Sequence, residues 1–180
     1  MKKNISLIIL PFLSVFCLFS LSCRKFEKTR DDGAVLIDID EKGSHQNPAW
    51  SPDGQYIVFT KFKKYNKEPA EIVRITLSGN TTTTLVSNGT GNVNLPGSCW
   101  NDSLGKIVFS SSREPHDEIY MITENGAAGS EEKITERTDK MAFEPSFSPD
   151  AAWIVFESHK TDEEGNGIIT KYKTSSKKYQ

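Results

Sequence analysis

The stretch Pro48-Ala49-Trp50-Ser51-Pro52-Asp53-Gly54-Gln55-Tyr56-Ile57-Val58-Phe59 decides the fold, because the chain repeats it. A close copy runs Pro145-Ser146-Phe147-Ser148-Pro149-Asp150-Ala151-Ala152-Trp153-Ile154-Val155-Phe156, and residues 96–109 form a looser copy. The Ile-Val-Phe triplets begin at Ile57, Ile107 and Ile154. A fixed period in this range predicts an array of one supersecondary unit.

Each copy predicts four short strands. A strand ending in an aromatic residue is followed by a Ser-Pro-Asp-Gly type of turn, whose residues favour a tight reversal, and then by a second strand. Alternating segments further on predict a third and a fourth strand. The second strands are predicted at 56–60, 106–110 and 153–158, the third at 71–77, 118–123 and 167–172, and the fourth at 83–87 and 133–136. Charged loops are predicted at 61–69, 111–117 and 159–166, and polar linkers at 40–47, 88–95 and 137–144.

A constant offset links the fourth strands to the repeats. Ile37, Leu85 and Ile134 each stand eleven residues before the proline that opens the next copy, Pro48, Pro96 or Pro145. Residues 35–39 are therefore predicted to be a fourth strand that belongs to no blade of its own. By the same alignment, Lys177 stands where the fourth strand of the third copy begins.

Four short antiparallel strands in each period are typical of a β-propeller blade, so the predicted fold class is all-β. The copies resemble the TolB-like (WD40-like) propeller repeat in Pro48 to Phe59 and Pro145 to Phe156, and the resemblance covers residues 34–180. It implies six blades in a ring, whereas about three are present here. Three interpretations stay open: a fragment of a longer propeller, an open arc, or a half ring that forms a six-bladed homodimer in which residues 35–39 complete the partner's last blade.

The N-terminus predicts export and anchoring. Lys2 and Lys3 precede an apolar stretch that ends at small residues, as in a signal peptide. Ser22-Cys23 resembles the lipobox of bacterial lipoproteins, so residues 1–22 are predicted to be cleaved, Cys23 to be acylated, and residues 23–33 to be a tether. The expected location is the periplasm or the outer membrane, as a membrane-anchored lipoprotein. An uncleaved anchor and ordinary secretion are the alternatives.

The remaining composition predicts no catalytic site, metal or cofactor. Net charge is −2, which gives no basic surface for nucleic acid. His45, His116 and His159 occupy non-equivalent repeat positions and are interpreted as solvated loop residues. With Cys17 and Cys23 assigned to the export segment, Cys99 stands alone and is predicted to be a small buried residue, without a disulfide.

The functional site that the sequence still predicts is a binding surface. The residues just before each innermost strand face the channel mouth of a propeller; repeat alignment places Asn47, Leu95 and Glu144 there, with His45 two residues earlier in the first copy. The alternative is that these residues only shape loops. The predicted function is a non-enzymatic protein- or peptide-binding module at the bacterial cell envelope. The alternative is a truncated relative of a propeller-containing peptidase or polysaccharide lyase.

Overall fold

A computed structural model describes residues 36–40, 42–65, 67–87, 93–94, 99–101, 103–136, 140–160 and 167–179. The chain divides into two compact units, Met1–Leu36 and Ile37–Gln180. The predicted signal peptide and the predicted tether with Cys23 lie outside the described residues, as does Leu95. Every regular element in the described ranges is a β-strand, and none of these ranges holds a helix with the length and apolar character needed to cross a membrane.

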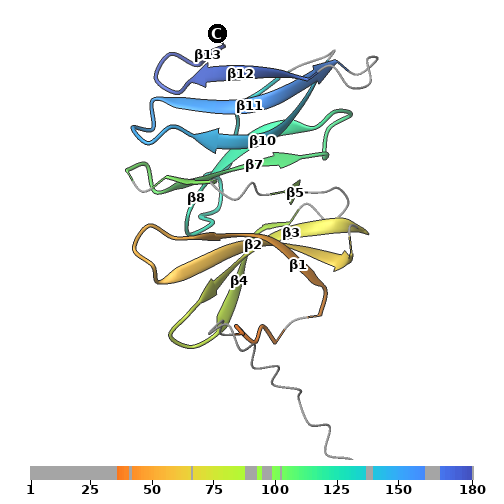
Figure 1. Ribbon diagram of the computed structural model, residues 1–180, viewed down its shortest axis with the longest axis vertical. Coiled ribbons are helices and arrows are strands. Elements are labelled where there is room, and N and C mark those ends of the chain that lie inside the picture. Colours follow the sequence, from red (N-terminus) through yellow and green to blue (C-terminus); the bar gives the residue numbers. More distant parts are fainter. Residues whose placement is uncertain are drawn as a thin grey trace, which may run out of the picture. The chain divides into compact units, whose positions relative to one another are not determined.

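The strands form three sheets that follow one another along the chain (Figure 1). Blade 1 has the order β1-β2-β3-β4, blade 2 the order β5-β7-β8-β9 with β6 also on β7, and blade 3 the order β10-β11-β12-β13. The bounds are β1 Ser44–Trp50, β2 Tyr56–Lys64, β3 Lys67–Thr76 and β4 Thr81–Ser87 in blade 1; β5 Val93–Asn94, β6 Trp100–Asn101, β7 Lys106–Ser111, β8 Glu118–Thr123 and β9 Glu132–Lys133 in blade 2; and β10 Lys140–Phe147, β11 Trp153–Lys160, β12 Ile168–Lys173 and β13 Lys178–Tyr179 in blade 3.

This is the predicted all-β architecture of propeller blades. All pairings between neighbouring strands are antiparallel. In blade 2, β5 and β6 pair with the two ends of β7, so together they take the place of a single first strand. Blade 1 contacts blade 2 and blade 2 contacts blade 3, and the described blades do not close a ring.

Several predicted boundaries are wrong. The linkers predicted at 40–47, 88–95 and 137–144 each contain part of a strand, because β1 begins at Ser44, β5 spans Val93–Asn94 and β10 begins at Lys140. Most of the charged loop at 61–69 is also strand, since pairing continues through Lys61 and Glu71, whose side chains form an ion pair at 2.8 Å. The fourth strand expected at 35–39 is absent from its described part, because residues 36–40 pair with none of the sheets.

Each blade has two faces, because side chains alternate along a strand. The leading face carries the first and last residues of the Ile-Val-Phe triplet, and the trailing face carries the middle valine. One continuous apolar core contains the trailing face of blade 1, both faces of blade 2 and the leading face of blade 3. A separate cluster of Ile57, Phe59, Val73 and Ile75 lies on the leading face of blade 1, where Ile39 packs against it.

The turns of blades 1 and 3 share one hydrogen-bond network. Ser51 Oγ donates to Asp53 Oδ1 at 2.6 Å, and the same carboxyl oxygen accepts from Gln55 N at 3.0 Å. Ser148 and Asp150 repeat these contacts at 2.6 and 3.0 Å. The position after the aspartate has a positive φ in both, 70° at Gly54 and 58° at Ala151, so the alanine carries a left-handed strain that glycine avoids.

Candidate functional site

Asn47 and Glu144 lie inside the first strands of their blades, at equivalent bulges. The register of β1 on β2 shifts between Gln46 and Ala49, and that of β10 on β11 shifts between Phe143 and Ser146. Both residues have a positive φ, 52° for Asn47 and 48° for Glu144, although neither is glycine. The repeat alignment therefore identified equivalent positions, but these residues interrupt a strand instead of preceding one.

His45 was expected in a loop and instead lies in β1, where it pairs with Lys61. Its ring meets Phe59 edge-on, with centroids 5.1 Å apart, and its Nε2 is buried without a hydrogen-bond partner. The side chain lines a cavity of about 160 Å³ whose other walls are Ile37, Ile39, Gln46, Pro48, Ile57, Phe59 and Ile75. His45 thus belongs to the leading face of blade 1.

The other two histidines and Cys99 lie in a loop, in a strand and in the core, respectively. His116 lies in a loop as expected, whereas His159 lies in β11 and contacts Glu157 Oε1 through Nε2 at 3.3 Å. No group of three or more His, Cys, Asp or Glu residues within the described ranges is arranged to hold a metal ion. Cys99 is fully buried and free, and burial raises the pKa of its thiol to about 12, so it is the inert core residue that was predicted.

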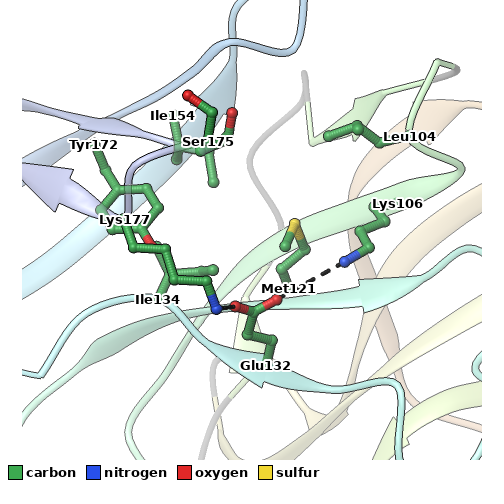
Figure 2. A pocket seen from close by; sticks show the side chains of 10 residues that line it. Leu104, Lys106, Met121, Glu132, Ile134, Ile154, Tyr172, Ser175 and Lys177 are labelled. Atoms are coloured by element: carbon green, nitrogen blue, oxygen red, sulfur yellow. Dashed lines mark hydrogen bonds and ion pairs between the residues drawn. The ribbon is translucent and has the colours of Figure 1, made fainter.

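A groove between blades 2 and 3 has a volume of about 350 Å³ (Figure 2). Its floor is apolar and includes Met121, Ile134 and Ile154, and its wall includes Tyr172. We call it the interblade groove. Burial raises the pKa of Tyr172, and Tyr179 OH donates to Ile134 O at 3.1 Å across the two blades.

Glu132 connects the two sides of the interblade groove. Its carboxylate accepts from Lys177 Nζ of blade 3 at 2.6 Å and lies 3.9 Å from Lys106 Nζ of blade 2. The hydrogen bond to Glu132 raises the pKa of Lys177. Figure 2 shows both lysines reaching the one carboxylate from opposite sides. Glu132 is therefore engaged as a link between blades. The residues that line the interblade groove come from five segments of the chain that only folding brings together. No sequence pattern therefore identified the groove.

The comparisons with known proteins agree with this architecture. No family model matches the chain. The Tol-Pal system protein TolB of Francisella tularensis subsp. mediasiatica is 28% identical over 136 residues, which are 76% of this chain and 30% of that protein. The chain thus spans less than a third of the length of this curated relative.

Solved structures show the same fold. A putative TolB from Agrobacterium tumefaciens superposes with a TM-score of 0.62 at 18% identity, over 79% of this chain and 50% of that one. An oligogalacturonate lyase in complex with manganese superposes with a TM-score of 0.59 at 13% identity, over 78% and 42% of the two chains. Enzymes and TolB proteins therefore share these blades, and the fold alone assigns no activity. The chain is similar to TolB in sequence, and its blades have the same fold as the blades of TolB β-propellers.

Proposed function

We propose that this chain is a non-enzymatic binding module of the bacterial cell envelope, which recognises a protein or peptide through the first strands of its blades. The observation that supports this most directly is the pair of equivalent bulges at Asn47 and Glu144. A bulge leaves its extra residue outside the ladder and redirects a side chain, and a positive φ at a residue other than glycine costs about 1 kcal/mol or more. Blades 1 and 3 both retain this strained feature at one position.

The chemistry at the two bulges favours a partner with an irregular surface. Asn47 offers a neutral amide and the exposed Glu144 a carboxylate, so the equivalent positions do not form a repeated small-ligand site. A folded protein or an extended peptide can contact unlike groups in succession. The similarity to TolB over 76% of the chain supports a partner in the envelope.

The proposal also names two further partners of the chain. One is a membrane, reached through a lipid anchor, and the other is a second copy of the chain in a homodimer. Acylation at Cys23 would hold the blades at a membrane, on the periplasmic side or at the outer membrane. The replacement Cys23→Ala is then expected to abolish labelling by a radioactive or clickable fatty acid. Labelling that persists in this variant would exclude Cys23 as the acylated residue.

Photo-crosslinking in intact cells tests the binding surface. A photoreactive phenylalanine analogue at position 47 or 144 is expected to give the same discrete crosslinked product, identified by mass spectrometry. The control is the same analogue at Thr83, an exposed position of β4 in blade 1. Equal product from position 83, or no discrete product from positions 47 and 144, would overturn the proposal.

A further inference from the structure

The junction between blades 1 and 2 is filled at a place where the junction between blades 2 and 3 is open. Arg74 and Met121 hold equivalent positions on the trailing faces, since each pairs with the valine of its triplet. The Arg74 guanidinium lies 4.5 Å from the Tyr56 ring centroid and donates to Glu124 O of blade 2 at 3.2 Å. One side chain thus reaches from blade 1 to blade 2 and closes that junction.

Blade 2 does not repeat this contact towards blade 3. Met121 has no N–H or O–H group, so it cannot donate as Arg74 does. The residue of blade 3 that is equivalent to Glu124 is Thr174, because each is the first residue after the third strand of its blade. Thr174 lines the interblade groove. Its carbonyl therefore lacks, from the described part of blade 2, the donor that Arg74 supplies to Glu124 O.

The turn that covers the first junction is also shorter at the second. Residues 124–131 connect β8 to β9, whereas the shorter segment 174–177 connects β12 to β13. Gly126 of the longer turn lies so close to Leu85 of blade 1 that an added Cβ would be 3.2 Å from the Leu85 Cα. Ile134, which precedes its proline by eleven residues as Leu85 does, lines the interblade groove instead. The groove is thus a specific difference between two otherwise equivalent junctions.

The interblade groove combines apolar walls with excess positive charge (Figure 2). Met121 and Tyr172 line it, and a sulfur and a ring both pack well against an aromatic side chain. Lys106 Nζ is 3.9 Å from the Glu132 carboxylate, which is beyond hydrogen-bond range, so its N–H groups can serve another acceptor. Because Lys106 and Lys177 share the one carboxylate, the groove favours an anionic group.

The carboxyl-terminal residue of a protein carries three groups that complement this groove. Its N–H can donate to Thr174 O, its carboxylate can accept from Lys106, and an aromatic side chain can cover Met121. An internal acidic residue fits less well, because neighbouring side chains of an extended segment point to opposite sides. A fatty acid has a carboxylate and an apolar part, but it has no N–H to donate.

We propose that the interblade groove binds the carboxyl terminus of another protein, whose last residue is aromatic. All of the lining residues belong to blades 2 and 3, and none of them belongs to a first strand. The groove is therefore a second binding site, which can be occupied whatever binds at Asn47 and Glu144.

Methionine methyl NMR of the full-length chain in detergent locates the bound peptide. The probe is a short glycine–serine peptide that ends in phenylalanine with a free carboxylate. It is expected to shift the ¹³C-methyl signal of Met121, which the variant Met121→Leu assigns, and to leave the signal of Met141 in β10 unchanged. No saturable shift of the Met121 signal, or an equal shift of the Met141 signal, would overturn the proposal. Missing crosslinks from positions 47 and 144 would leave the Met121 shift in place, so the two sites are tested apart.

Matched changes in the chain and in the probe test the carboxylate contact. Lys106→Met should raise the dissociation constant of the peptide about tenfold, and the same peptide with a carboxyl-terminal amide should bind the unmodified chain with a similar loss. Lys133→Met removes the same charge from blade 2 at a residue that pairs with Glu114 at 3.6 Å and does not line the groove, so it should have no effect. Unaltered affinity in the Lys106→Met variant would refute the contact.

Filling the groove gives an independent readout. Met121→Arg copies the arrangement of Arg74 in blade 1 and should abolish peptide binding, because the new side chain covers the floor and donates to Thr174 O. Octanoate, which has no N–H, should displace the peptide poorly. Displacement by octanoate as effective as that by unlabelled peptide would show that any apolar anion suffices, and this would overturn the proposal of a protein terminus.

Discussion

The side chains of Ser51 and Asp53 stabilise the first turn of blade 1 by a closed set of hydrogen bonds. Ser51 Oγ accepts from Tyr56 N at 2.9 Å while it donates to Asp53, so one hydroxyl joins the two ends of the turn. The hydrogen bond from Ser51, followed by that from Gln55 N, lowers the pKa of Asp53. Ser148 lowers the pKa of Asp150 in the same way.

Removing the serine hydroxyl should therefore raise the pKa of the aspartate beside it. A folded-state pKa below the unfolded value of about 3.9 gives stability that is present above that value and is lost as the pH falls through the folded pKa. Ser51→Ala should move the Asp53 pKa towards 3.9 and leave Asp150 unchanged, and Ser148→Ala should do the converse. Side-chain carboxyl NMR titration measures both. An Asp53 pKa that is the same in Ser51→Ala and the unmodified chain would contradict this account.

At the scale of elements, a buried carboxylate fixes the outer strand of blade 2. Thr135 Oγ donates to Glu118 Oε2 and accepts from Ile119 N, the latter at 2.8 Å. Glu118 is 2% exposed and Thr135 is fully buried. The Thr135 side chain thus continues the contact with β8 beyond the two residues of β9.

Thr135→Val should lower the free energy of unfolding by about 2–3 kcal/mol, because it leaves a buried carboxylate oxygen and a buried N–H without this partner at nearly constant volume. Thr135→Ser retains the hydroxyl and should recover most of the loss. Urea unfolding followed by circular dichroism measures both, and Thr83→Val on the exposed surface of β4 serves as the control. A loss of less than about 0.5 kcal/mol, which is usual for surface changes, would argue against this role.

Strands with strong apolar patterns were predictable, and those formed by polar residues were not. Residues 118–123 were predicted with the bounds that β8 has, because Glu-Ile-Tyr-Met-Ile-Thr favours a strand locally. The beginning of β1 is polar, and only pairing with β2 makes it a strand. The beginning of β10 contains Met141, Ala142 and Phe143, which are apolar, and it was missed because the repeat alignment assigned it to a linker. Likewise, repeat spacing identified Asn47 and Glu144, but a bulge is a property of register between two strands. Residues 36–40 have strand-like residues, but no strand of the described sheets is registered on them.

At the scale of the whole molecule, the blades should unfold together. A single apolar core runs through all three, and Glu132 and Lys177 link two of them across the interblade groove. Repeat arrays lose cooperativity only when their interfaces are weak relative to the repeats themselves. A shared core of this extent favours one transition.

The three tryptophans allow this to be measured, because Trp50, Trp100 and Trp153 lie in blades 1, 2 and 3. In the chain labelled with 5-fluorotryptophan, the three native ¹⁹F signals are expected to disappear at the same urea concentration. Single Trp→Phe variants assign the signals. Earlier loss of the Trp50 signal would show that blade 1, with its separate leading-face cluster, unfolds on its own.

The lysines of β12 bear on how this strand can pair with other strands. Two β12 strands brought side by side would place Lys171 and Lys173 of one copy near those of the other, and like charges across a ladder are unfavourable. These charges therefore discourage fibre growth through direct pairing of one β12 strand with another.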